Sequence, residues 1–247
     1  MTELLTITGP TACGKTRFAA QLAYLLDGEI ISADSRQVYR RMDIGTGKDL
    51  DDYIVAGRPI PYHLIDVAEP GTKYNVYRYQ HDFHQAYNDI CSRGRMPILC
   101  GGTGLYIESV LKNYEFDGRV CPKLVGSIVV GLMIDRDTRR QRISRRLDQR
   151  LKEGMVDEVK ALLSEGVSSE TLIRYGLEYK YVTLYLLGKI TADEMHDLLE
   201  IAIHQFAKRQ MTWFRGMEKR GTKIHWIDTT LPIEQQIVEV KKLLTNS

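Results

Sequence analysis

The eight residues GPTACGKT at 9–16 constrain the fold more than any other stretch of this sequence. They follow a short apolar run and precede the helical pattern TRFAAQLAYLL, and they match G-x-x-x-x-G-K-[ST] in the strand, loop and helix context that this phosphate-binding pattern needs. Gly9 and Gly14 let the backbone turn its amides inward, while Lys15 and the helix N-terminus add positive charge. The sequence therefore predicts a site for the phosphates of a nucleotide, a sugar phosphate or an isoprenoid diphosphate.

This loop also provides most of the expected ligand contacts. The Thr16 hydroxyl is a candidate Mg²⁺ ligand, so Mg²⁺ is the expected cofactor. We interpret Cys13 as a small side chain that fills a tight turn, and the four cysteines form no CxxC pair, which favours reduced thiols and no structural zinc. The residues expected to contact the phosphates are Gly9, Thr11, Ala12, Cys13, Gly14, Lys15 and Thr16.

Apolar and β-branched runs alternate with helical patterns through the first half of the chain. This rhythm is typical of βαβ units, and it predicts an α/β fold with a P-loop NTPase-like parallel sheet flanked by helices. The strand candidates are 4–9, 29–34, 62–67, 96–102 and 127–134, and the helix candidates among them are 16–26 and 76–94.

The second half of the chain is mainly helical. A charged helix is expected from near Thr138 to Gly154, further helical patterns follow, and Thr191 is a candidate N-cap for a long helix. A short strand at 223–228 and a helix at 232–244 end the chain. We expect residues 1–135 to form the α/β core with the ligand pocket and residues 136–247 to pack back on it. The most prominent linker is 113–123, where Gly118 and Pro122 interrupt both periodicities.

Two further loops are predicted to reach the same edge of the sheet. Asp34 follows the second strand, where α/β folds place their ligands, and it is either a helix N-cap, an acid near Mg²⁺ or a general base. Thr103 lies in a second glycine-rich turn, ILCGGTGLY, whose glycines allow close approach of the backbone or simple packing of helix on strand.

Positive charge is concentrated in two segments although the net charge is only +2. Arg142 and Arg146 are four residues apart on the charged helix, so they share a face and are candidates to bind phosphate oxygens together. The segment 206–223 interleaves lysines and arginines with Trp213 and Phe214, which are either stacking surfaces for nucleic acid or core residues. The sequence contains no apolar run of membrane-spanning length and no signal-type N-terminus, so we expect a cytoplasmic protein with no membrane partner.

Five motifs together resemble those of the tRNA dimethylallyltransferase family in order and spacing: GPTACGKT, SADSRQVYRRMDIGTGK, HLIDV, GGTGLYI and AKRQMTWFR. The resemblance implies transfer of a dimethylallyl group from dimethylallyl diphosphate to the exocyclic amine of the adenosine next to the anticodon, with the tRNA anticodon stem-loop as partner. It also implies that Asp34 removes the amine proton beside Thr103 and that Arg209 binds the diphosphate with the P-loop. The residues that it places around the base are Ser35, Arg36 and Gln37.

The sequence departs from the family pattern in two places. Family members usually carry a helical insertion before the arginine helix that grips the anticodon stem-loop, but here only LKNYEFDGRVCPKLVGS separates the two motifs. The family's Gly-Tyr-Lys-Glu stretch reads YGLEYKY at 175–181. The resemblance thus implies a compact form with an intact transfer site.

Three other functions remain open from the residues. The missing insertion is compatible with dimethylallyl transfer to AMP or ADP, and the P-loop, Asp34 and the arginines are compatible with an ATP-binding small-molecule kinase. A non-catalytic RNA-binding relative is the third. A monomer is the expected oligomeric state.

Overall fold

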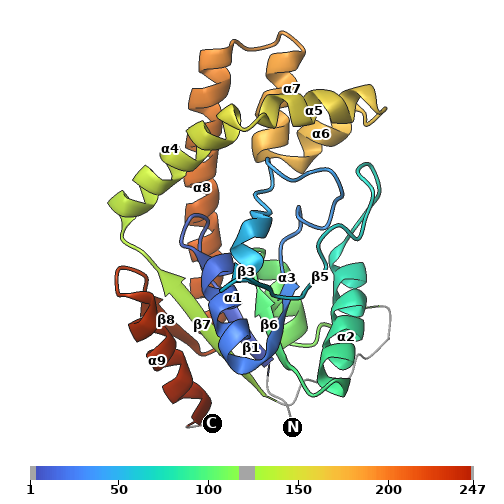
Figure 1. Ribbon diagram of the computed structural model, residues 1–247. Helices are drawn as coiled ribbons and strands as arrows, with labels where there is room; N and C mark the ends of the chain where they lie inside the picture. The colour runs from blue at the N-terminus through green and yellow to red at the C-terminus, as the bar shows by residue number, and fades with distance from the viewer. Residues whose placement is uncertain (1–3, 117–125, 246–247) are drawn as a thin grey trace.

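A parallel β-sheet with helices on both faces forms the lower part of the molecule in Figure 1. The computed structural model describes residues 4–116 and 126–245. Every hydrogen-bonded pair of strands in this sheet runs parallel, in the order β5-β2-β6-β1-β7-β8, which confirms the predicted fold class. The strands are β1 Leu4–Thr8, β2 Gly28–Ser32, β5 Tyr62–His63, β6 Met96–Cys100, β7 Ser127–Met133 and β8 Ile224–Asp228.

Two hydrophobic cores lie on opposite faces of this sheet. Leu5 and Ile7 of β1 pack with side chains of α1 and α9, whereas Leu4 packs with side chains of α2, α3 and α8. Successive side chains of a strand point to opposite faces, so a strand that is covered on both faces reads as a continuous apolar run. The covering helices are α1 Lys15–Leu26, α2 Val76–Ser92, α3 Gly104–Leu111, α8 Ala192–Lys219 and α9 Ile233–Thr245.

One predicted strand is much shorter than expected. The run at 62–67 forms only the two residues of β5, because Leu64 and Asp66 have positive φ angles of 63° and 57° and the chain leaves the extended conformation. The sequence interpretation also missed a small hairpin of β3, Ile54–Val55, and β4, Arg58–Pro59. Its Ala56-Gly57 turn has positive φ at both residues, which is the geometry that two-residue hairpin loops favour.

The helical part stands above the carboxyl edge of the sheet, and α8 runs from it down to the sheet (Figure 1). Asp135 caps α4, which begins two residues before the expected Thr138, and Thr191 forms a capping box with Glu194 at the start of α8, as predicted. The expected boundary near residue 135 falls between β7 and α4. However, β8 and α9 return to the sheet, so the division into two parts stays a prediction. The other helices of this part are α4 Arg136–Lys152, α5 Met155–Ser164, α6 Ser169–Tyr175 and α7 Leu177–Leu186.

Some expectations fall on residues that are not described. Gly118, Cys121 and Pro122 of the predicted linker lie outside the described residues. Cys13, Cys91 and Cys100 are free thiols. Within residues 4–116 and 126–245, no helix combines the length and the apolar character that crossing a membrane requires.

A buried carboxylate stabilises the amino edge of the sheet, away from the strand ends that carry the glycine loops. The side chain of Glu29 on β2 is 2% exposed, and it accepts a hydrogen bond from Arg93 at 2.9 Å and contacts His63 at 2.8 Å. The hydrogen bonds from Arg93 hold the pKa of Glu29 below its ordinary value of 4.5. A carboxylate with a lowered folded pKa stabilises the fold above its unfolded pKa and loses this effect as the pH falls through the folded value.

We expect Glu29→Gln to lower the free energy of unfolding at pH 7 by about 1–3 kcal/mol, because the charge-assisted hydrogen bonds are lost. Urea unfolding at several pH values measures this. The difference from wild type should shrink as the pH falls below 4.5. Asp89→Asn removes only an exposed partner of Arg93 and should change stability by less than about 0.5 kcal/mol. A Glu29→Gln effect of the same size at pH 3 and pH 7 would contradict this assignment.

Candidate active site

A cavity of about 960 Å³ lies at the carboxyl edge of the sheet, beneath the helical part. This is where open α/β sheets place their ligands, because the loops that follow neighbouring parallel strands meet at one edge. Of the residues predicted from the sequence, Gly9 and Cys13 do not line it. Those that do are Thr11, Ala12, Gly14, Lys15, Thr16, Asp34, Ser35, Arg36, Gln37, Thr103, Arg142, Arg146 and Arg209.

The P-loop, residues 9–16, has the backbone that its glycines predict. Gly14 is the N-cap of α1 with φ of 84°, and a Cβ atom on Gly9 would lie 2.6 Å from the carbonyl oxygen of Leu132 on β7. The ammonium group of Lys15 donates a hydrogen bond to the Pro10 carbonyl at 2.8 Å, so it lies over its own loop. Cys13 is buried in the core beneath α1, in agreement with its interpretation as a filling side chain.

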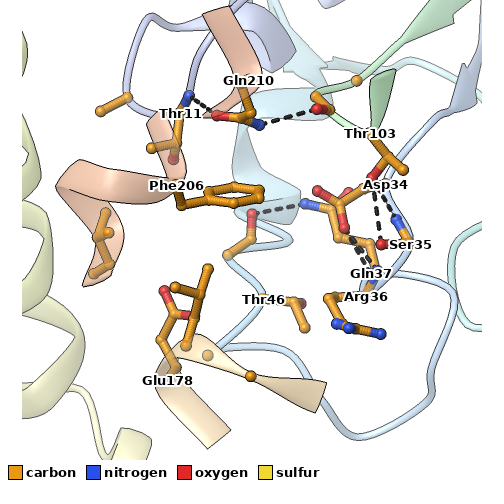
Figure 2. A pocket seen from close by; sticks show the side chains of 18 of the residues that line it. Thr11, Asp34, Ser35, Arg36, Gln37, Thr46, Thr103, Glu178, Phe206 and Gln210 are labelled. Carbon is orange, nitrogen blue, oxygen red and sulfur yellow. Dashed lines mark hydrogen bonds between the residues drawn. The ribbon is translucent and has the colours of Figure 1, made fainter. Parts of the chain in front are cut away.

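Asp34 is held in place by the chain that follows it. Its Oδ1 atom accepts hydrogen bonds from the backbone amides of Arg36, at 2.8 Å, and Gln37, at 3.3 Å. These bonds cap a turn rather than a helix, and they fix the direction of the carboxylate in the cavity (Figure 2). Asp34 therefore caps backbone amides as predicted, but those of a turn and not of a helix. Its second carboxylate oxygen takes no part in these two bonds.

Thr103 joins the second glycine turn to the Asp34 segment. Its hydroxyl accepts a hydrogen bond from the Ser35 amide at 3.0 Å, and its own amide donates to the Ala33 carbonyl at 3.0 Å. A Cβ atom on Gly101 would lie 2.3 Å from that same carbonyl oxygen, so only glycine allows the two segments to approach this closely. The predicted close approach of the backbone is thus present.

Gln210 connects the two glycine loops, and the sequence interpretation missed it. It is the residue after Arg209 on α8, and it is 7% exposed. Its Oε1 accepts from the Thr11 amide at 2.8 Å, and its Nε2 donates to the Gly102 carbonyl at 3.0 Å (Figure 2). The only signal in the sequence is the AKRQMTWFR motif, in which Gln210 follows the predicted diphosphate ligand Arg209.

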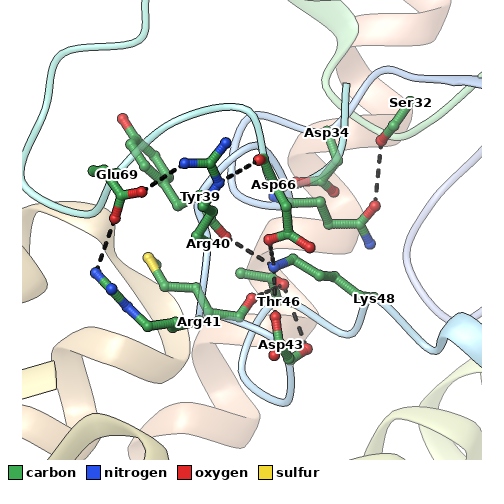
Figure 3. A network of polar contacts seen from close by, with 12 residues as sticks. Ser32, Asp34, Tyr39, Arg40, Arg41, Asp43, Thr46, Lys48, Asp66 and Glu69 are labelled. Carbon is green, nitrogen blue, oxygen red and sulfur yellow. Dashed lines mark hydrogen bonds and ion pairs between the residues drawn. The ribbon is translucent and has the colours of Figure 1, made fainter. Parts of the chain in front are cut away.

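A buried lysine holds the segment that carries Asp34 and Gln37. Lys48 is 1% exposed, and its ammonium group donates to the Tyr39 carbonyl at 2.8 Å and to the carboxylates of Asp43 and Asp66 (Figure 3). Each of the three N–H donors of the ammonium group thus has an acceptor, so the buried charge is fully hydrogen-bonded. The segment is thereby closed into a compact loop, although Lys48 was not predicted to have a role.

The helical part is fastened to this loop by Glu158 of α5. Its carboxylate accepts from the amides of Asp43 and Ile44 at 2.7 Å, from the Gly45 amide at 3.1 Å and from the Tyr179 hydroxyl at 2.7 Å. Charge-assisted hydrogen bonds of this kind are among the stronger ones in proteins. They set the position of α5 above the cavity.

Arg142 and Arg146 of α4 line the cavity as predicted, but one of them is already in an ion pair. Arg146 forms an ion pair with Asp49, whereas Arg142 is exposed. Arg150 was not predicted as a site residue, yet it also lines the cavity, 3.5 Å from Glu178. Burial raises the pKa of Glu178 and lowers that of Arg150.

Aromatic side chains border the cavity as well. Phe214 is fully buried, which confirms the core interpretation for this residue, whereas Trp213 lines the cavity and is 39% exposed, so its stacking role stays a prediction. The guanidinium of Arg36 lies 5.4 Å from the centre of the Tyr175 ring, which is within cation–π range. Burial raises the pKa of the Cys100 thiol to about 12, as is typical of a structural cysteine.

The donor set at the P-loop fits a magnesium ion only in combination with a substrate. No group of three or more His, Cys, Asp or Glu side chains in the described ranges is arranged to hold a metal ion. Mg²⁺ is commonly held by one or two protein oxygens together with phosphate and water oxygens. Thr16 lines the cavity beside Lys15 and is a suitable oxygen ligand for an ion that arrives with a diphosphate.

Comparisons with known proteins identify the class. The family model described as IPP transferase matches residues 37–126 and 121–217, and the one described as isopentenyl transferase matches residues 2–60. The chain is 52% identical to tRNA dimethylallyltransferase 1 of Parabacteroides distasonis, covering 99% of this chain and 98% of the relative. It is 50% identical to tRNA dimethylallyltransferase 2 of Phocaeicola vulgatus, covering 98% and 97%.

Solved structures agree with these matches. The full-length tRNA isopentenylpyrophosphate transferase of Bacillus halodurans is 31% identical with a TM-score of 0.86, covering 100% of this chain and 96% of that one. The enzyme of Staphylococcus epidermidis is 26% identical with a TM-score of 0.85 and full coverage of both chains. The chain therefore belongs to the tRNA dimethylallyltransferase family, a class of prenyl-transferring enzymes with a P-loop NTPase-like fold, as its motifs predict.

The comparisons also support the shortening. The alignments with the two bacterial relatives extend over 301 and 300 residues, although this chain has 247, so the relatives contain residues that it lacks. The match to the IPP transferase model is in two parts that meet at 121–126. This is the place between the second glycine turn and α4 where the insertion was expected to be missing.

We expect Gln210→Met to lower the free energy of unfolding by about 1–3 kcal/mol, because it leaves the Thr11 amide and the Gly102 carbonyl without their partner. Gln205→Met, an exposed change one turn earlier on α8, should alter stability by less than about 0.5 kcal/mol. Urea unfolding of the two variants measures the difference. Equal stability of both variants would show that the bridge contributes nothing.

Proposed function

We propose that this protein transfers the dimethylallyl group of dimethylallyl diphosphate to the exocyclic amine of the adenosine next to the anticodon in tRNA. The observation that carries the proposal is that one continuous cavity joins the P-loop to Asp34 and Thr103 in a member of this family. The relatives named above are called tRNA dimethylallyltransferases, and four of the five motifs that resemble this family contribute residues to the cavity here.

The P-loop is proposed to bind the diphosphate. Its amides at Gly14 to Thr16, the N-terminus of α1 and the ammonium group of Lys15 all attract phosphate oxygens. When the allylic C–O bond breaks, its electron pair leaves with the diphosphate and negative charge grows on these oxygens. Preorganised donors therefore stabilise the transition state more than the ground state.

Arginine side chains of α4 and α8 are proposed to complete the diphosphate site. Arg142, Arg146 and Arg209 line the cavity and are proposed to bind the remaining diphosphate oxygens. Arg146 would exchange its ion pair with Asp49 for the substrate. Mg²⁺, held by Thr16 and the diphosphate, would supply further positive charge to the leaving group.

The opposite end is proposed to hold the acceptor. Ser35, Arg36 and Gln37 would surround the adenine base, whose amine then lies beside Asp34 and Thr103. Asp34 orients this weak nucleophile and takes its proton as the new C–N bond forms. The adenosine has to leave its stack to enter the cavity, at a cost of a few kcal/mol.

The anticodon stem-loop would be held without the insertion. Exposed cations on α8, such as Lys208, Arg215 and Lys219, and exposed arginines on α4 offer contacts to phosphates. The expected cytoplasmic location and monomeric state stay predictions.

The proposal is tested by incubating the protein with Mg²⁺ and labelled dimethylallyl diphosphate, in parallel with unmodified tRNA, AMP, ADP and ATP. Mass analysis of the nucleosides then locates the label. We expect label in tRNA alone, at the adenosine next to the anticodon. Label in a mononucleotide alone, or in none of the acceptors, would contradict the proposal.

We expect Asp34→Asn to lower kcat for tRNA by about 10²–10⁴, because the general base is lost. Asn keeps an oxygen that can accept from the Arg36 and Gln37 amides, so the loop should retain its shape. Asp51→Asn removes an exposed carboxylate outside the cavity and serves as the matched control with unchanged kcat. Steady-state kinetics with tRNA measures both, and wild-type turnover by Asp34→Asn would exclude this role.

A further inference from the structure

An apolar patch on α8 faces the cavity at a position that no role above explains. Phe206 lies three residues after Ile203 and four after Ala202, so the three share one helix face, and all three line the cavity. Figure 2 shows the ring of Phe206 reaching from α8 into the cavity, across from Asp34. Ala202 and Ile203, each 8% exposed, line the same cavity.

The patch lies next to the proposed diphosphate site. One turn further along α8, Arg209 lines the same cavity and Gln210 binds the Thr11 amide of the P-loop. The facing wall is polar, because it carries Asp34 and its neighbours. A ligand with its anionic head on the P-loop therefore has this apolar face of α8 within the same cavity for its tail.

We propose that Ala202, Ile203 and Phe206 bind the isoprenoid chain of the donor and that the ring of Phe206 limits its length to one isoprene unit. The inference rests on the proposed function and names the donor specificity of the same site. The C1 atom must lie between the diphosphate oxygen that it leaves and the amine that it joins, with the amine proton passing to Asp34. The apolar tail that extends from C1 then contacts Phe206.

The test compares dimethylallyl diphosphate with geranyl diphosphate, which is one isoprene unit longer, as donors for wild type and Phe206→Ala. We expect the ratio of kcat/KM for geranyl over dimethylallyl to rise at least tenfold in Phe206→Ala, about the discrimination that one or two methylene groups provide in an apolar pocket. Ile201→Ala, which shortens a 53% exposed side chain of the same helix outside the cavity, should leave the ratio unchanged.

A second measurement does not depend on the acceptor. Competition of geranyl diphosphate and of inorganic diphosphate against labelled dimethylallyl diphosphate should show tighter binding of the longer donor to Phe206→Ala, with inorganic diphosphate unaffected. Should Phe206→Ala fail to fold, Phe206→Leu provides a smaller gain in the same ratio, because leucine keeps much of the apolar volume.

Unchanged donor selectivity in these variants would overturn the inference. An unchanged selectivity together with a raised KM for tRNA would show instead that the ring stacks on the nucleobase. Wild-type protein that binds the donor but modifies no tRNA would contradict the proposed function, and the competition measurement would still decide the role of Phe206.

Discussion

The close backbone contact between Ala33 and the second glycine turn is the constraint on which the site depends. Gly101 approaches the Ala33 carbonyl so closely that a Cβ atom would lie 2.3 Å from its oxygen, and the Thr103 amide binds the same carbonyl. This contact brings the Thr103 hydroxyl to the Ser35 amide and so fixes where Asp34 lies relative to the strand ends. The P-loop is then joined to the same assembly through Gln210, and the two ends of a transfer site stay at a set distance from each other.

The segment after Asp34 is held from two sides. Lys48 binds Tyr39 and Asp43 within the segment and Asp66 outside it, and Glu158 binds three amides of the segment from the helical part. A Cβ atom on Gly47 would overlap the guanidinium of Arg150, so a larger residue there would displace this arginine from its place beside the segment. The segment that follows Asp34 is therefore connected to both α4 and α5, and these contacts hold the arginines of α4 over the cavity.

Much of the fold and part of the site could be predicted from the sequence, for physical reasons that differ by residue. The P-loop, the strand runs and the Thr191 cap depend on neighbours within a few residues, so local patterns reveal them. Gln210 and Glu158 act on atoms 199 and 113–115 residues away, and no local pattern records such partners. The predicted strand at 62–67 was cut short for the same reason, since Asp66 turns toward distant Lys48 instead of continuing the strand.

A crystal structure with an unreactive thiolodiphosphate analogue of the donor and an anticodon stem-loop tests most directly whether this cavity holds both substrates. We expect the diphosphate on the amides of Gly14 to Thr16 and the adenine amine within hydrogen-bond reach of Asp34. The C1 atom should lie about 3–3.5 Å from that amine, as a near-attack geometry requires. An adenine bound outside the cavity, or a diphosphate bound away from the P-loop, would contradict this expectation.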